Sequence, residues 1–229
     1  MKMSNTRRLY ALTALVVVGS IGASACASLN KKEEGAVIGA AAGGAVGGVI
    51  GNQTGSTARG AIIGAVVGGT AGAIIGHQMD QQAKELSQNI PGATVARVGE
   101  GIAVTFASGL LFAFDSDQIL PAAGTNLTEL AKSLQKYPES QLLIVGHTDN
   151  VGDVSYNQRL SERRSNSAAT YLATQGVSRT RLEATGKGET EPIATNETDA
   201  GRQQNRRVEV AIYASEAYRQ RLLKSNTGD

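Results

Sequence analysis

The sequence predicts an α/β sandwich, a mixed β-sheet with helices on one face, preceded by a glycine-rich helical hairpin. Between residues 93 and 214, segments with the two-residue period of strands alternate with segments of helical period. Between residues 35 and 76 the pattern changes, because half of the chain's 28 glycines fall there. The 229 residues therefore divide into one mid-sized domain and N-terminal extensions.

Residues 1–25 have the organisation of a signal peptide. Basic residues are followed by an apolar segment and by small residues at 23–25 that form a cleavage site. The single cysteine, Cys26, comes directly after this site, where bacterial lipoproteins carry the thiol that is lipidated. We expect a lipid on Cys26 and a linker over residues 26–34; the alternative is a cleavage that leaves the thiol unmodified. Because Ala27 rather than Asp follows, the resemblance to lipoprotein sorting favours the outer membrane.

Glycine recurs at every fourth residue in two sets, at positions 35, 39, 43, 47, 51 and 60, 64, 68, 72, 76. On a helix this spacing lines one face, where two backbones can approach closely. Turn residues from Asn52 to Ala58 separate the sets. The region 35–76 is therefore expected to form a helical hairpin with both glycine faces inward, and it resembles the glycine-zipper segments of bacterial envelope proteins.

The hairpin is expected to insert or oligomerise in a membrane, because Arg59 is its only charge and helices satisfy their backbone groups internally. A soluble glycine-rich bundle and a flexible spacer are the alternatives. No Asp or Glu lies within either arm to carry protons.

The remaining elements follow in chain order. Residues 77–92 are a polar helical connector that ends at a proline and a glycine. Next come strands at 94–98 and 101–106, a helix over 121–137, a strand at 181–185, a glycine-rich turn and a strand at 205–213. The tail, residues 215–229, predicts a short helix with a polar end.

We expect the binding site in the segment LLIVGHTDNVGDVSYNQRLSERR at 142–164. This segment lies between the predicted helix at 121–137 and the predicted strand at 181–185. Four apolar residues, Leu142 to Val145, followed by a polar loop predict a buried strand that ends at the surface. From Tyr156 on, apolar residues recur at helical spacing beside paired arginines. Asp149 in the loop and Arg164 on the helix can therefore face each other.

This segment resembles the OmpA-like C-terminal domain, a peptidoglycan-binding module also found in the peptidoglycan-associated lipoprotein. The resemblance spans residues 95–213 and includes FAFDSD at 112–117, ATGKGETEPI at 184–193 and NRRVEV at 205–210 in the same order. It implies that the chain binds the stem peptide of peptidoglycan, in particular the free end of meso-diaminopimelate, which carries an ammonium and a carboxylate on one carbon.

Matched residue by residue, the resemblance implies that Asp149 binds the ammonium and Arg164 the carboxylate. Arginine suits this role because its planar fork donates two parallel hydrogen bonds to a carboxylate. From spacing alone, a salt bridge between these two residues is the favoured interpretation, because exposed ion pairs are common, although they contribute little to stability; the four motifs in order shift the choice to the binding role. The rest of the implied pocket consists of Gly146, Thr148, Asn150, Asn157, Leu160 and Ser161, with Arg207 as a further candidate.

Residue types argue against other functions. Twenty-two basic and 20 acidic residues give a net charge of +2 without a one-sided basic face, which argues against nucleic-acid binding. His147 lies near Asp149, but no Ser or Cys nucleophile is identifiable beside them, so we expect a hydrogen-bonded strand-end histidine and no catalytic residue. Two histidines without cysteine or carboxylate at ligand spacing argue against a metal, and no cofactor is expected.

Together these features predict a non-catalytic lipoprotein of the outer membrane whose periplasmic domain, residues 93–214, anchors that membrane to the cell wall. The lipid and the hairpin would hold the membrane, and homo-oligomers or other envelope proteins are compatible partners. One alternative is a glycine-zipper membrane protein that modulates outer-membrane assembly or stress, with peptidoglycan binding secondary. Another is a cell-wall hydrolase, for which the sequence supplies no catalytic group.

Overall fold

The structure, a computed structural model, describes residues 55–227. The expected signal peptide, the lipidation candidate Cys26, the linker 26–34 and the first glycine set lie outside the described residues. The second glycine set and the whole α/β region lie within them.

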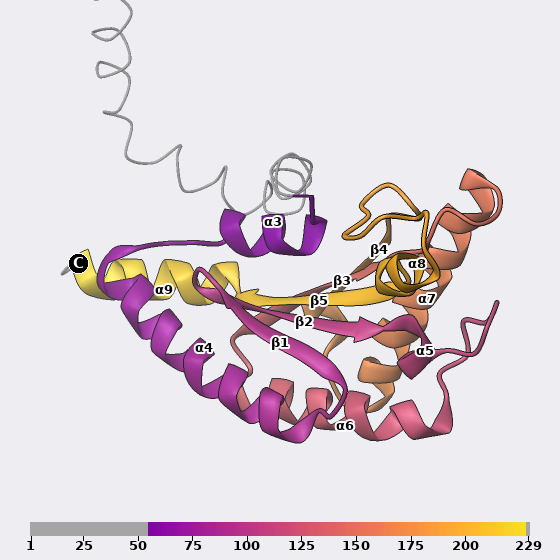
Figure 1. The fold of residues 1–229 in the computed structure, drawn as a ribbon. Helices are drawn as coiled ribbons and strands as arrows, with labels where there is room; N and C mark the ends of the chain where they lie inside the picture. The colour runs from indigo at the N-terminus through magenta and orange to yellow at the C-terminus, as the bar shows by residue number, and fades with distance from the viewer. Residues whose placement is uncertain (1–54, 228–229) are drawn as a thin grey trace, which may run out of the picture. The chain divides into compact units, whose positions relative to one another are not determined.

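Five strands form one mixed sheet in the order β1-β2-β5-β3-β4 (Figure 1). All neighbours are antiparallel except β3 and β4, which are parallel and joined by a helical crossover. The mixed sheet predicted from the alternating pattern is confirmed. The strands are β1 (Ala93–Val98), β2 (Gly101–Ala107), β3 (Ser140–Gly146), β4 (Leu182–Gly186) and β5 (Arg207–Ala214).

Three long helices cover one face of this sheet: α4 (Gly69–Asn89), α6 (Pro121–Lys136) and α7 (Val154–Thr174). Their apolar stripes pack on every second residue of the strands, such as Val208, Val210 and Ile212 of β5. This arrangement confirms the predicted layer of helices on one face. The shorter elements are α5 (Ser108–Leu111), η2 (Arg179–Arg181), α8 (Asp199–Asn205) and α9 (Glu216–Thr227).

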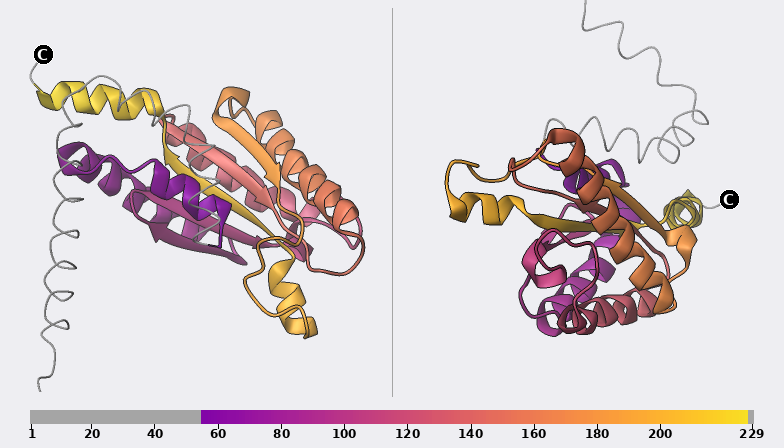
Figure 2. Two further views of the ribbon diagram at one scale, coloured as in Figure 1. Left: turned by 90° about the horizontal axis from the view of Figure 1, so that it is seen from above. Right: turned by 90° about the vertical axis from the view of Figure 1, so that its right-hand side faces the viewer.

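The opposite face of the sheet carries helix α3 (Thr57–Gly64), seen from above in Figure 2. Ala58, Ala61 and Ile62 of α3 are buried there in a second apolar cluster. Gly101 of β2 allows this approach, since a Cβ at that position would lie 2.5 Å from Cγ2 of Ile62. The strand residues beneath α3 are Ala103, Leu143, Val145, Ala211 and Tyr213.

The second glycine set differs from the single hairpin arm that its spacing predicts. The chain turns between α3 and α4, where Gly68 and Gly69 have φ values of 73° and 61° that only glycine adopts readily. The carboxylate of Glu100 accepts hydrogen bonds from the Val67 and Gly68 amides at 2.9 and 2.8 Å and holds this turn. The set is therefore divided between two helices on opposite faces of the sheet, with Gly60 and Gly64 in α3, Gly72 and Gly76 in α4, and Gly68 in the turn between them.

Helix α4 also continues through the predicted polar connector at 77–92. Its buried residues Met79, Ala83 and Leu86 belong to the main core, so this segment is part of the folded domain. None of the helices in the range 55–227 combines the length and the apolar character needed to cross a bilayer.

Candidate functional site

The site forms where β3 ends and the chain turns into α7. Gly146 ends the strand, and a Cβ there would lie 2.2 Å from the backbone oxygen of Ser161 on α7. Glycine is therefore required for the strand and the helix to come this close. The following loop passes Asp149 and Asn150 and reaches Gly152, whose φ of 101° also favours glycine, before α7 begins.

A pocket of about 200 Å³ opens beside this loop. Five of the residues implied by the sequence line it: Thr148, Asp149, Asn157, Leu160 and Arg164. The other lining residues are Phe114, Asp115, Val151, Tyr156, Arg202 and Arg206.

Arg164 is a buried cation at this pocket, with 5% of its surface exposed. Its Nε donates to the Ser116 carbonyl at 2.9 Å, and Nη2 lies 3.5 Å from the Ala113 carbonyl. The guanidinium also lies over the Phe112 ring, 5.3 Å from its centroid. Within the described chain no carboxylate forms an ion pair with Arg164, and burial lowers its pKa. The positive charge is desolvated and oriented; the carboxylates of Asp115 and Asp117 lie near enough to oppose the effect of burial on its pKa, but neither forms an ion pair with it.

Asp149 provides the opposite charge. One carboxylate oxygen accepts the Val151 amide at 3.1 Å, and the other forms an ion pair with Arg206. The alternative in which Asp149 and Arg164 pair with each other is therefore not what the structure shows. Both charges face the same pocket while having different partners.

Asn157 holds the loop that carries Asp149. Its side-chain amide donates to the carbonyls of Asp149 and Val151, both at 3.2 Å, and to the Glu189 carboxylate at 2.7 Å. These bonds tie α7, the loop after β3 and the loop after β4 together. Thr148 contributes a buried hydroxyl for which the structure shows no hydrogen-bond partner.

The remaining implied residues do not line the pocket. Ser161 is fully buried; its hydroxyl donates to Gln158 and accepts the Gly188 amide at 2.9 Å, so it positions the neighbouring turn. Gly146 serves close packing, and Asn150 is exposed in the loop.

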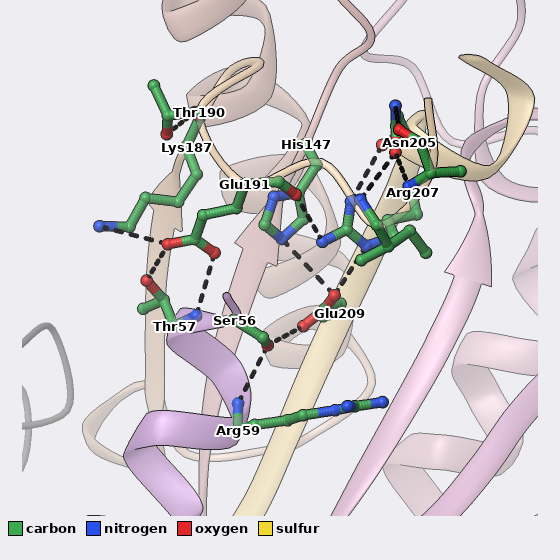
Figure 3. A network of polar contacts seen from close by, with 12 residues as sticks. Ser56, Thr57, Arg59, His147, Lys187, Thr190, Glu191, Asn205, Arg207 and Glu209 are labelled. Atoms are coloured by element: carbon green, nitrogen blue, oxygen red, sulfur yellow. Dashed lines mark hydrogen bonds and ion pairs between the residues drawn. The ribbon is translucent and has the colours of Figure 1, made fainter. Parts of the chain in front are cut away.

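Arg207 lies on the other face of the sheet, in the polar network of Figure 3. It is 1% exposed, and its Nε donates to the Glu209 carboxylate at 2.7 Å. Its neighbour Arg206 lines the pocket instead. The two-residue period of a strand predicts this difference. Counted in steps of two, Arg206 falls on the same face as Val208 and Val210, which face the helix layer that includes α7.

His147 belongs to the same network and differs from the expectation of a hydrogen-bonded histidine. Neither ring nitrogen has a hydrogen-bond partner among the described residues, and Nε2 lies 3.9 Å from Glu209. Burial, together with the positive charge of Arg207, lowers the pKa of His147 to about 3. The imidazole is therefore neutral at ordinary pH.

Other pocket residues that sequence reasoning missed come from the loop after α5 and from α7. Tyr156 donates a hydrogen bond to Asp115, which joins the start of α7 to that loop. Phe114 is 97% exposed at the rim. Both Phe114 and Asp115 lie in the FAFDSD motif. The motif therefore indicated that this segment belongs to the family domain, but not which of its side chains reach the pocket.

A mixed sheet with three long helices on one face and the short α3 on the other, together with a pocket lined by both charges at the end of β3, defines an α/β domain suited to binding a small charged group. The chain belongs to the OmpA family. The OmpA family model matches residues 111–206, and the model of the YMGG-like Gly-zipper matches residues 2–80.

Several relatives are proteins of the outer membrane. The chain is 38% identical over 115 residues to the outer-membrane lipoprotein YfiB of Pseudomonas aeruginosa, covering 50% of this chain and 68% of YfiB. It is 37% identical over 136 residues to the probable lipoprotein YiaD of Escherichia coli, covering 58% of this chain and 62% of YiaD. The match to outer membrane porin F of Pseudomonas fluorescens is 40% over 103 residues, 45% of this chain and 32% of the porin. The match thus spans less than two thirds of YiaD and about one third of the porin.

Solved structures show the same fold. A MotB-like protein from Desulfovibrio vulgaris superposes with a TM-score of 0.57 at 25% identity, covering 63% of this chain and 96% of that one. The cell wall anchor of the T6SS from Pseudomonas aeruginosa superposes with a TM-score of 0.50 at 30% identity, covering 62% and 97%.

Proposed function

We propose that this chain is a non-catalytic envelope lipoprotein that anchors the outer membrane to the cell wall by binding the diaminopimelate-containing stem peptide of peptidoglycan. Membership of the OmpA family supports the proposal, as do the names of three similar proteins: an outer-membrane lipoprotein, a probable lipoprotein and a cell wall anchor. None of the relatives and structures named above is described as an enzyme.

The observation that carries the proposal is the state of Arg164. Arg164 has only 5% of its surface exposed, and its guanidinium donates to carbonyl oxygens and forms no ion pair with a carboxylate of the described chain, so an anion in the pocket would offset the cost of burying this charge. A ligand carboxylate can do so through hydrogen bonds stronger than those to neutral acceptors.

The ammonium of the same ligand would then bind Asp149. Asp149 already forms an ion pair with Arg206, so the ligand ammonium would bind Asp149 either together with Arg206 or in its place. Leu160 and Val151 offer apolar surface to the methylene chain that leads to the charged carbon. The pocket of about 200 Å³ is lined by both acidic and basic side chains, and this suits a small zwitterion better than a single ion.

We further propose that residues 1–25 are removed, that Cys26 carries the lipid, and that the domain lies in the periplasm. Each contact with one stem peptide is then expected to be weak, and many copies in the plane of the membrane would make the attachment firm. The match of residues 2–80 to a Gly-zipper model keeps a second candidate open, in which the glycine-rich segment modulates the outer membrane and wall binding is secondary.

Co-sedimentation with purified sacculi tests the proposal. The full-length protein in detergent is mixed with sacculi of the diaminopimelate type, and Asp149→Asn and Arg164→Lys are compared with Arg163→Ala. Arg163 is the matched control, because it precedes Arg164 on α7 but is 46% exposed and lies outside the pocket.

We expect wild type and the control to sediment, and each pocket variant to bind at least tenfold more weakly, a loss of about 1.4 kcal/mol. Free meso-diaminopimelate should compete. Wild type that stays in the supernatant, or pocket variants that bind like wild type, would overturn the proposal and favour the second candidate.

A further inference from the structure

The N-terminal end of α3 is fastened to the domain by two carboxylates. The Ser56 hydroxyl donates to Glu209 at 2.6 Å, and the Thr57 hydroxyl and amide donate to Glu191 at 2.5 and 3.0 Å (Figure 3). These contacts join residues more than 130 positions apart in the chain. They add specific polar contacts to the apolar packing of α3 on the sheet.

The two carboxylates are part of a buried network. Glu209 is 6% exposed and pairs with Arg207 at 2.7 Å, and Arg207 also donates to the Glu191 carbonyl at 3.0 Å. Burial opposes the charge on Glu209, but Arg207 and the Ser56 hydroxyl outweigh it, so the pKa of Glu209 is lowered. Without α3, Glu209 and Glu191 would lose their hydrogen bonds from the Ser56 and Thr57 hydroxyls. They would also lose the helix that shields them from water.

The segments that build this network also build the pocket on the other side of the sheet. Arg207 is adjacent to Arg206, the partner of Asp149. Glu191 lies two residues after Glu189, which accepts from Asn157.

The third shared segment is the one after β3, where His147 of the network lies two residues before Asp149. The backbone joins the segments as well, because the His147 amide donates to the Arg207 carbonyl at 2.9 Å and the Thr148 amide to the Gly188 carbonyl at 2.8 Å. A shift of Glu209 or Glu191 therefore acts on segments that hold Asp149, Arg206 and Asn157.

We propose that α3 is a positioning element for the peptidoglycan pocket: docking of Ser56 and Thr57 on Glu209 and Glu191 strengthens stem-peptide binding, and stem-peptide binding strengthens the docking of α3. This inference rests on the proposed function and adds its regulation. The two effects must be equal in free energy, because coupling between two sites is reciprocal.

The coupling would link wall binding to the first glycine set, residues 35–51, which precedes α3 in the chain. Any interaction that moves residues 56 and 57 away from the sheet would also lower the affinity for the stem peptide. The bonds are few and lie at one end of an eight-residue helix, so α3 can detach while the helix layer on the other face remains packed.

The first test measures affinity in the full-length protein. The double variant Ser56→Ala/Thr57→Val removes both hydroxyls and retains the apolar residues of α3. Ser87→Ala is the control, since the Ser87 hydroxyl forms only a local, exposed bond within α4. With the tripeptide L-alanyl-γ-D-glutamyl-meso-diaminopimelate as ligand, the double variant should bind at least fivefold more weakly and the control like wild type.

The second test uses a readout that general destabilisation does not reproduce. Arg59 is an exposed trypsin site within α3, and cleavage after it reports detachment of the helix. Saturating tripeptide should slow this cleavage in wild type by a factor similar to the affinity loss of the double variant. In Asp149→Asn the tripeptide should give no protection.

The outcomes separate the two proposals. If wild type does not bind the tripeptide or sacculi, the proposed function fails and this inference fails with it. If wild type binds but the tripeptide leaves cleavage after Arg59 unchanged, or if the double variant binds like wild type, only the inference is overturned.

Discussion

Arg206 forms an ion pair with Asp149 at the pocket, whereas the next residue, Arg207, pairs with Glu209 in the buried network beneath α3. The two arginines thus serve opposite faces of the sheet. The side chain of Arg206 is 41% exposed and that of Arg207 is 1% exposed. Both carboxylates are buried, so the pairs differ in the cation: water reaches Arg206, whereas Arg207 is desolvated and depends on Glu209 to offset that cost.

This contrast predicts different costs of substitution. Arg207→Met should lower the free energy of unfolding by about 3–5 kcal/mol, because it leaves Glu209 buried without its cation. Arg206→Met should cost less than Arg207→Met, about 1–2 kcal/mol, because Arg206 itself is partly exposed and Asp149 keeps its hydrogen bond from the Val151 amide. Urea denaturation measures both values. The double variant Arg207→Met/Glu209→Gln should recover most of the loss, and an equal cost for both single variants would contradict the assignment of the two faces.

The close approach of β3 and α7 makes a second prediction. Gly146→Ala should cost at least about 2–3 kcal/mol, because the added methyl would meet the backbone oxygen of Ser161, which cannot rotate away. Gly109→Ala is the control, since nothing lies within 4 Å of a Cβ at that position. Thermal unfolding should separate the two variants, and a tolerated alanine at Gly146 would mean that α7 lies further from the strand.

The strand, loop and helix around Asp149 and Arg164 were predictable because each has a strong local signal: an apolar run, a polar break and a helical period. The choice between Arg206 and Arg207 was also accessible from strand parity. The partner of Asp149 was not, because it depends on a contact between residues 57 positions apart.

The second glycine set shows where local reasoning fails. A spacing of four is compatible with one helix, and nothing in the set itself reveals that Gly68 and Gly69 adopt positive φ. That outcome depends on the sheet, which buries Ala58, Ala61 and Ile62 on the face opposite α4. Tertiary burial therefore decided between two structures that the local pattern permitted equally.

The packing of α4 yields a third prediction. Leu86→Ala should destabilise the domain by about 2–5 kcal/mol, because Leu86 is 1% exposed in the main core. Lys84→Ala, on the exposed side of the same helix, should be close to neutral. If chemical denaturation finds both variants neutral, residues 77–92 act as the polar connector that composition suggested.

The buried imidazole of His147 yields a prediction about pH. Its pKa falls from 6.5 to about 3 on folding, so between these values the unfolded chain binds a proton that the folded chain does not. Stability should therefore fall as pH decreases below about 6.5, with a slope approaching 1.4 kcal/mol per pH unit from this residue. The range from pH 6.5 to 5 isolates the effect, because most carboxylates are still ionised there.

Urea denaturation across that range should show the slope in wild type and a flatter profile in His147→Leu. His77→Gln is the control, because His77 is the only other histidine and is exposed on α4, so this variant should keep the wild-type slope. A slope that persists in His147→Leu would show that other groups take up the proton. A slope lost in His77→Gln would place the titrating histidine on α4, outside the buried network.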